Sequence, residues 1–274
     1  MDTVRTGPAI GLVAQVTVLS ALAATAGLGV AGWVTGLAYA LVLAAALQRG
    51  MVRERIPVFG PADWVTMTRA ALIGGVAALT ADSFDRTPRV GVIVSLAIVA
   101  LLLDGVDGQV ARRTGTVSGF GARFDMEVDS FLLIALSVYV ARSMGPWVLV
   151  IGGMRYAFVA AGWAFDWMRA QLPPRFWRKV VAAVQGIALV IGAADVLPTA
   201  LTLLALLIAV ALLLESFGRD VMWLWRNGHR DMALAVDAAA SPRHAASPSP
   251  DDAQRLQRGV SGVGHPGARA AGGD

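Results

Sequence analysis

The sequence of 274 residues contains no cysteine and few charged side chains. The lack of cysteine excludes disulfide bonds and thiolate metal ligands, and it leaves the redox compartment undetermined. Aspartate, glutamate, lysine and arginine together make up 15% of the chain, against about 25% in an average soluble domain. Hydrophobic residues make up 56%, and the mean hydropathy is +0.63. This balance indicates an integral membrane protein.

The apolar residues are gathered in long segments. Because a hydrocarbon core of about 30 Å is crossed by a helix of roughly 20 apolar residues, the first ~225 residues divide into about eight spans. The expected spans are 10–28, 30–48, 64–81, 89–112, 120–142, 146–168, 177–194 and 198–224. We therefore expect an all-α polytopic membrane helical bundle, with an N-terminal transmembrane hairpin in residues 1–55, a six-helix core in 56–230 and a C-terminal tail in 231–274.

The first two spans form one apolar run that is broken only by Gly27, Gly29 and Gly32. A signal peptide is the alternative for the first span, because Arg5 precedes an apolar stretch with small residues near its end. The apolar stretch continues past any such cleavage site into a second hydrophobic segment. An uncleaved helical hairpin is therefore the simpler prediction.

The basic residues alternate between the two ends of the expected spans. A formal net charge of +4 and a pI near 10.3 could suggest a nucleic-acid partner, but their placement follows the positive-inside pattern of membrane proteins instead. The expected inner segments hold Arg49, Arg53, Arg55, Arg112, Arg113, Arg123, Arg169, Arg175, Arg178, Lys179, Arg219, Arg226 and Arg230. The expected outer loops hold Arg86, Arg89 and Arg142. We therefore predict a multi-pass protein of the cell membrane with both termini in the cytoplasm and no nucleic-acid partner.

The composition changes after about residue 231, where alanine, serine, proline, glycine and scattered charges replace the long apolar segments. Alternating serine and proline occupy 247–250, and glycine is frequent in 262–273. Such a segment buries too little apolar surface to offset the entropy of ordering it. We expect this tail to be disordered.

Four aspartates lie where the fourth span ends and the fifth begins. Asp104 and Asp107 directly follow the apolar run 90–103, and Asp125 and Asp129 come after a short intervening segment. An ionised carboxylate near the hydrocarbon core costs about 2.5–3.5 kcal/mol on insertion scales unless a partner compensates it. Four such groups together indicate bound cations or a water-filled cavity, and they locate a candidate active site.

Helical spacing brings these carboxylates together. Positions 104, 107, 108 and 111 share one helix face, and positions 121, 125 and 129 share a face of the next helix. The short connection makes the two helices antiparallel neighbours, so two carboxylate pairs can meet. Facing carboxylates suit hard cations, either one Mg²⁺ or two ions about 4 Å apart that hold a phosphate during transfer. Arg112 offers a charge-assisted fork for a phosphate, and the small side chains nearby let a ligand approach the backbone.

The pattern Asp104-x2-Asp107-Gly108-x2-Ala111-Arg112-x8-Gly121-x3-Asp125-x3-Asp129 matches every fixed position of the signature of the CDP-alcohol phosphatidyltransferases. The wider resemblance covers about residues 60–225, where Asp63-x2-Thr66-x2-Arg69 resembles the family's first-helix stretch, usually Asn-x2-Thr-x2-Arg. Asp63 departs from the usual asparagine. The resemblance implies a core of six transmembrane helices, and it does not account for the N-terminal hairpin.

The resemblance also implies an activity. Members of this family transfer a substituted phosphate group from a CDP-linked donor, typically CDP-diacylglycerol, to the hydroxyl of a small alcohol or polyol phosphate, with release of CMP. The implied cofactor is Mg²⁺ or Mn²⁺, as two ions. By resemblance the metal ligands are Asp104, Asp107, Asp125 and Asp129, and Asp129 is alternatively the catalytic base. The implied nucleotide or donor contacts are Thr66, Arg69, Gly108, Ala111, Arg112 and Gly121.

Three other charged residues are candidates for lesser roles. Arg155 interrupts an apolar stretch, so it either contacts the acceptor or pairs with a carboxylate such as Asp166. Lys179 either contacts the acceptor or extends its amine to the membrane surface. Glu127 lies outside the motif, at i+2 from Asp125, and is expected to be solvated or paired with an arginine.

Two other classes of function compete with a transferase. A cation transporter would need polar groups at several depths, whereas these acids concentrate at one helix pair. A non-catalytic membrane scaffold is disfavoured by the complete signature. The identity of the acceptor, the metal and a possible homodimer stay open at the level of sequence.

Overall fold

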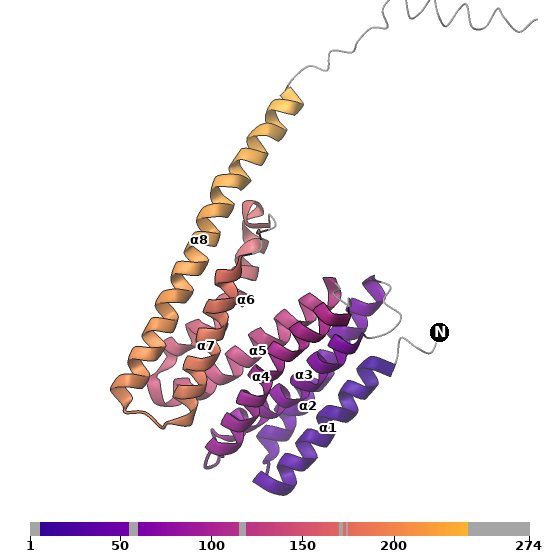
Figure 1. Ribbon diagram of the computed structural model, residues 1–274, viewed down its shortest axis with the longest axis vertical. Helices are drawn as coiled ribbons and strands as arrows, with labels where there is room; N and C mark the ends of the chain where they lie inside the picture. The colour runs from indigo at the N-terminus through magenta and orange to yellow at the C-terminus, as the bar shows by residue number, and fades with distance from the viewer. Residues whose placement is uncertain (1–5, 55–59, 115–118, 170–171, 174, 241–274) are drawn as a thin grey trace, which may run out of the picture. The chain divides into compact units, whose positions relative to one another are not determined.

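The computed structural model describes residues 6–54, 60–114, 119–169, 172–173 and 175–240, and these residues form helices joined by short turns (Figure 1). The α-helices are α1 (Thr6–Ala26), α2 (Val30–Glu54), α3 (Pro61–Asp82), α4 (Val90–Thr114), α5 (Gly119–Met144), α6 (Leu149–Ala164), α7 (Phe176–Ala194) and α8 (Thr199–Ala240). Short 3₁₀ turns occupy Pro146–Val148 and Asp166–Arg169. Within the described residues there is no strand, so the predicted all-α fold class is confirmed.

Six of these helices are long and apolar enough to cross a membrane, namely α1, α2, α3, α6, α7 and α8. In α4 the apolar part is shorter and covers Val90–Val106, and α5 does not meet the same criteria. The reason is the acidic motif itself, because it places charged residues in the last turns of α4 and the first turns of α5. The polytopic bundle is confirmed, and its two least apolar helices are those that carry the candidate site.

α3 is the central helix of the bundle. It packs against α1, α2, α4 and α5, and 72% of its apolar stretch is buried, compared with 17% of that of α6. Small residues such as Ala70, Gly74 and Ala78 line much of its surface and allow close helix approach. The middle of α3, from Thr66 onward, therefore lies at the centre of the packed region, next to α4 and α5.

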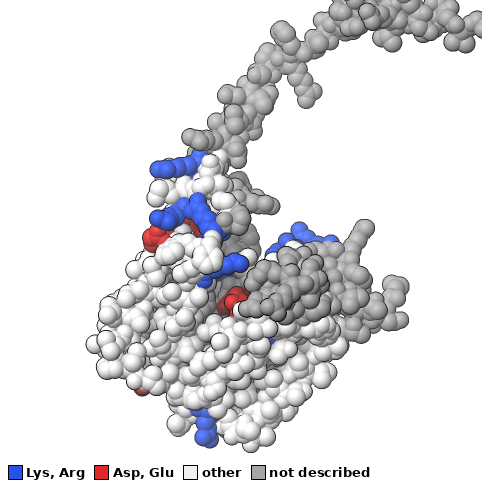
Figure 2. All heavy atoms as spheres, viewed as in Figure 1, with Lys and Arg blue, Asp and Glu red and all other residues white. Residues whose placement is uncertain are grey.

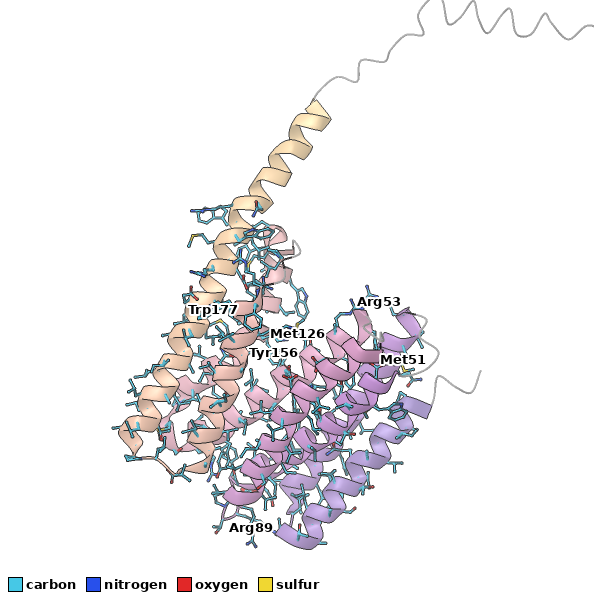
Figure 3. All side chains as sticks on the ribbon, in the orientation of Figure 1. Met51, Arg53, Arg89, Met126, Tyr156 and Trp177 are labelled. Atoms are coloured by element: carbon cyan, nitrogen blue, oxygen red, sulfur yellow. The ribbon has the colours of Figure 1, made fainter. Side chains whose placement is uncertain are left out.

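The N-terminal hairpin of α1 and α2 is attached to the core by polar contacts at one end. Asp82, at the end of α3, accepts hydrogen bonds from the backbone N–H of Gly29 at 2.7 Å and of Gly32 at 3.2 Å, so it caps α2 from another helix. Arg86 donates to the carbonyl of Gly27, and Arg89 donates to the carbonyl of Ala26, which satisfies the last carbonyls of α1. Figure 3 shows Arg89 at this end of the helices and Arg53 at the opposite end.

The last helix extends beyond the end expected for the core. The described residues up to Arg226 form one compact unit. Helix α8 ends at Ala240, past the expected boundary at residue 230. Residues 241–274, which make up most of the predicted tail, lie outside the described part of the chain.

Candidate active site

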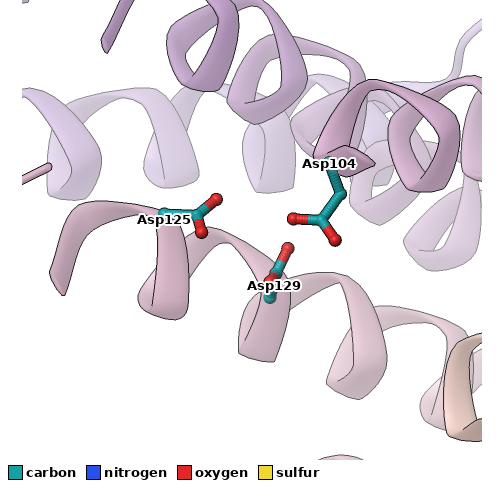
Figure 4. Close-up of side chains that lie close together, drawn as sticks. All are labelled: Asp104, Asp125 and Asp129. Carbon is teal, nitrogen blue, oxygen red and sulfur yellow. The ribbon is translucent and has the colours of Figure 1, made fainter. Parts of the chain in front are cut away.

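Three of the four motif aspartates converge from α4 and α5. The sequence predicted that these two helices pack together as antiparallel neighbours, but in the described residues both pack against α3 and α7 and make little contact with each other. Asp104 comes from the later part of α4, whereas Asp125 and Asp129 lie on successive turns of α5 (Figure 4). One carboxylate oxygen from each residue lies within 4.8 Å of those from the other two. The i, i+4 spacing on α5 thus produces the cluster that the sequence predicted.

The centre of this cluster is occupied by Arg69 from α3. Its guanidinium Nη2 lies 3.1 Å from Asp104 Oδ1, and Nη1 lies 2.5 Å from Asp125 Oδ1. Nη2 also forms an ion pair with Asp129 Oδ1. The Arg69 side chain is 0% exposed, whereas the three carboxylates remain 44%, 36% and 40% exposed. A buried guanidinium of this kind is held by paired carboxylates, and the carboxylates keep an accessible side for a ligand.

The donor set fits a divalent cation. Carboxylate oxygens are the ligands that Mg²⁺ and other hard cations prefer, and these three are already preassembled on two helices. Three carboxylates and one guanidinium leave a formal charge of −2, which a divalent ion would balance. Among the described residues this is the one group of three or more acids with such spacing, as expected for a local site rather than a cation path.

The structure describes the other motif positions unevenly. Asp107, Gly108, Ala111 and Arg112 belong to the last part of α4, but their side chains lie outside the described residues. The other three predicted nucleotide or donor residues are Thr66, Arg69 and Gly121. Thr66 is buried one turn before Arg69 on α3, and Gly121 is half-buried one turn before Asp125 on α5. The predicted residues thus belong to α3, α4 and α5, and α3 packs against the other two helices.

Asp63, the first residue of the stretch Asp63-x2-Thr66-x2-Arg69, has a structural role. Asp63 accepts a hydrogen bond from the backbone N–H of Gly60 at 2.8 Å, which caps the N-terminus of α3. This carboxylate replaces the asparagine that is usual in the resembling stretch. Its contact here is with the protein backbone.

Arg155 pairs with a carboxylate, as one of the two sequence hypotheses allowed, but the partner is Glu127. The Arg155 Nη2 forms an ion pair with Glu127 Oε1, and Nη1 lies 2.7 Å from the sulfur of Met126. The side chain of Asp166, the partner that the sequence suggested, lies outside the described residues. Figure 3 shows Met126 and Tyr156 in this region, where α5 meets α6. Of the two alternatives for Glu127, pairing with an arginine is thereby confirmed. Lys179, the other candidate acceptor residue, is exposed on α7.

A second group of ion pairs joins α7 to α8. Arg178 Nε lies 2.9 Å from Asp220 Oδ2, and Arg175 Nη1 lies 3.8 Å from Asp220 Oδ1. Trp177 donates its indole N–H to Glu215 at 2.9 Å. Figure 2 shows that most basic side chains visible on this face lie toward one end of the molecule, with an acidic surface in the hollow beside them. The sequence analysis assigned these two arginines only to the inner, positively charged segments. Their pairing with buried Asp220 depends on how α7 packs against α8, which the sequence pattern does not show.

Two comparisons with known proteins found a match. The sequence profile of the CDP-alcohol phosphatidyltransferases matches residues 59–214, which is more than half of the chain. A CDP-diacylglycerol–serine O-phosphatidyltransferase of Methanocaldococcus jannaschii is 41% identical over 67 residues. This alignment covers 24% of the chain and 27% of that relative, so the chain spans about a quarter of the relative's length. No solved structure matches the chain.

Proposed function

Because the chain belongs to the CDP-alcohol phosphatidyltransferase family, we propose that it transfers a phosphatidyl-type group from a CDP-linked donor, CDP-diacylglycerol, to the hydroxyl of a small alcohol or polyol phosphate in phospholipid biosynthesis. The observation that carries this proposal is the cluster of Asp104, Asp125 and Asp129, three acids of the motif that come together from α4 and α5, two helices that both pack against α3. In a multi-pass membrane protein, each ionised acid within a helix carries a free-energy cost that a bound ion or a paired charge must offset. Three such acids in one place are therefore typical of a binding site.

The motif residues take distinct roles in this reaction. Asp104, Asp107, Asp125 and Asp129 would hold Mg²⁺ or Mn²⁺, two ions in our proposal, and the bound metal would stabilise charge on the diphosphate and on the departing CMP. Asp129 accepts the proton of the acceptor hydroxyl. The acceptor oxygen then forms a bond to the phosphatidyl phosphorus, the bond from that phosphorus to the CMP oxygen breaks, and the electron pair leaves with CMP.

The donor is held by residues of α3, α4 and α5. Arg112 would pair with a phosphate, and Gly108, Ala111 and Gly121 leave space for the nucleotide close to the helix backbone. Thr66 and Arg69 complete this set from α3. Buried Arg69 keeps the carboxylates of α4 and α5 together, and we infer that its positive charge also favours binding of the donor phosphates on the open side of the cluster.

The orientation follows from the basic residues. We propose that the cluster and both termini face the cytoplasm of the cell, where CDP-linked substrates are available, because the inner segments carry most of the arginines. The acceptor would enter between α5 and α6, where Arg155 reaches Glu127, and exposed Lys179 of α7 would supply a further positive charge. Both residues are proposed acceptor contacts.

An acceptor panel tests the proposed activity. Purified protein in lipid nanodiscs is incubated with CDP-diacylglycerol, Mg²⁺ and one of three acceptors, namely L-serine, glycerol 3-phosphate or inositol phosphate, and the lipid product is identified by mass spectrometry. Serine is included because the similar protein of Methanocaldococcus jannaschii is named a CDP-diacylglycerol–serine O-phosphatidyltransferase. We expect one acceptor to give a new phospholipid together with an equal amount of CMP. Neither product with any acceptor, from protein that remains folded, would contradict the proposal.

A further inference from the structure

The N-terminal hairpin lies outside the matched family region, yet its second helix contacts the helix that carries two aspartates of the site. The family match begins at residue 59, whereas α2 ends at Glu54 and packs against both α3 and α5. Its closest approach to α5 is at Gly50, in the end of α2 that carries Met51 and Arg53 (Figure 3). A segment beyond the family region thus touches the first turn of α5.

The contact at Gly50 leaves no space for a larger side chain. A Cβ atom added to Gly50 would lie 2.5 Å from Phe120 Cε2 and 3.2 Å from Phe120 Cδ2. The Phe120 side chain is buried, and its ring packs on that of Phe124 with centroids 6.3 Å apart and an interplanar angle of 25°. Because the ring is enclosed on both sides, it has little freedom to turn away. The glycine therefore sets how closely α2 and the start of α5 approach.

A second contact joins the same two helices farther along. The rings of Tyr39 on α2 and Phe131 on α5 stack with centroids 4.5 Å apart and an interplanar angle of 25°. The order of the contacting residues is reversed between the helices, so α2 and α5 are antiparallel where they touch. Asp125 and Asp129 lie between these two contacts in the sequence of α5. Helix α2 therefore holds α5 on both sides of the acids.

The residues that face α2 fix the direction in which the acids point. Phe120, Phe124 and Val128 follow one another at i, i+4 and i+8, and all three are buried in the core that α5 shares with α2. Asp125 and Asp129 each come one residue later than a member of this buried row, which turns them by about 100° around the helix axis. Any rotation of α5 that moves the buried row also moves the two carboxylates.

We propose that α2 is a positioning element of the acidic site, in which Gly50 receives the ring of Phe120 and thereby sets the rotation of α5 that presents its two aspartates to a divalent cation. The inference rests on the proposed function. Gly50 and Phe120 carry no metal-ligating side-chain atoms, so their effect is exerted through the position of α5. The same rotation brings the carboxylates of Asp125 and Asp129 to buried Arg69. Groups that orient metal ligands contribute to affinity although they do not touch the ion.

The test measures Mn²⁺ binding to purified Gly50→Ala protein by electron paramagnetic resonance of the free ion. The added methyl group meets the Phe120 ring, so α5 must shift or turn. We expect the Mn²⁺ concentration for half-saturation to rise about tenfold, as when a group that orients metal ligands is lost. Phe120→Leu should weaken binding by a smaller factor, because it leaves a space instead of a clash. The double variant should recover most of the wild-type affinity, since the shorter side chain accommodates the methyl group.

Gly36→Ala is the matched control, because Gly36 lies on the same helix and an added Cβ atom there would lie 2.5 Å from Leu19 Cδ2 of α1. It should lower the melting temperature and bind Mn²⁺ as the wild type does. In assays, the Mg²⁺ concentration for half-maximal rate should rise in Gly50→Ala and not in Gly36→Ala, and the rate at saturating Mg²⁺ should change less.

Unchanged Mn²⁺ binding in Gly50→Ala would overturn the inference, as would equal weakening in Gly36→Ala or no recovery in the double variant. If Gly50→Ala does not fold, Phe120→Leu alone decides, and Mn²⁺ binding equal to wild type in that variant would overturn the inference. Wild-type protein that neither binds Mn²⁺ nor releases CMP would instead contradict the proposed function itself.

Discussion

At the scale of single residues, the site is defined by how four charges share a small space. Asp104, Asp125 and Asp129 repel one another when ionised, and Arg69 offsets part of that repulsion while it is removed from solvent. The carboxylates are more exposed than the arginine. The arrangement therefore favours an added cation on the open side of the cluster and a fixed positive charge on the closed side.

Two competing roles of Asp129 can be distinguished by experiment. This residue is either a metal ligand alone or the base that accepts the acceptor proton. We expect Asp129→Asn to lower turnover at saturating Mg²⁺ by about 10²- to 10⁴-fold, because an amide cannot accept that proton. The measurement is the initial rate as a function of Mg²⁺ concentration at saturating donor and acceptor. The control is Asp85→Asn, which changes an exposed acid in the turn after α3. Full recovery at high Mg²⁺ would make Asp129 a ligand and not the base.

The acidic cluster was predictable from sequence, whereas its arginine partner was not. The spacing of the aspartates on two consecutive helices is a local property, because helical periodicity fixes which positions share a face. Arg69 lies 35 residues before Asp104, and its contact depends on the rotation of α3 against α4 and α5. That rotation is set by packing of small residues along α3, which the apolar composition does not specify. The same limit applies to Glu127 and Arg155, which meet across two helices.

At the scale of helices, the position of α6 depends on close backbone contact with α5. A Cβ atom at Gly152 would lie 2.7 Å from the backbone nitrogen of Ile134 and 2.8 Å from the carbonyl oxygen of Leu133. The N–H of Gly152 also donates to the Ser137 hydroxyl at 3.1 Å, a polar contact that joins the start of α6 to α5. The contact involves main-chain atoms, so it cannot be relieved by a side-chain rotation.

We expect Gly152→Ala to destabilise the protein by about 1–3 kcal/mol or more, because α5 and α6 must separate to accept the methyl group. Gly153→Ala is the matched control, since a Cβ atom there meets nothing within 4 Å and alanine is the better helix former. Thermal unfolding in detergent measures both. A Gly152→Ala protein as stable as Gly153→Ala would contradict the close packing of these helices.

The attachment of the hairpin provides a second prediction at this scale. Asp82→Ala should lower stability by about 1–3 kcal/mol, because the N–H groups of Gly29 and Gly32 lose their buried acceptor. Asp85→Ala, which removes an exposed carboxylate from the same turn, should leave the melting temperature nearly unchanged. If both substitutions have the same small effect, Asp82 does not hold the hairpin to the core.

At the scale of the whole molecule, hydrophobicity predicted the order of the described helices, and six of the eight expected spans are long and apolar enough to cross a membrane. Hydrophobicity was less informative about α4 and α5. The segments that carry the motif contain charged residues, so they do not form uniform spans of about 20 apolar residues. In α4 the apolar part ends at Val106, before the last motif residues, and α5 begins with charged residues. The polar turns of these helices need neighbours or water, so their environment depends on packing.

The proposed sidedness can be tested with single cysteines, since the chain has none of its own. Asp85→Cys, in the exposed turn after α3, should react with an impermeant maleimide in intact cells. Gly119→Cys, at the exposed start of α5, should react only after the cells are opened. The reverse labelling pattern would place the acidic cluster on the outer side and contradict the proposed orientation.

The central claim is that the acidic cluster holds a divalent cation for transfer from a CDP-linked donor. The most direct measurement is CMP release from CDP-diacylglycerol by purified wild-type protein in nanodiscs, with the productive acceptor, in excess chelator and after Mg²⁺ or Mn²⁺ is added back. We predict that release stops in chelator, returns with either metal, and stays absent with metal in Asp104→Asn and Asp125→Asn proteins that fold normally. Undiminished CMP release in excess chelator would contradict the account.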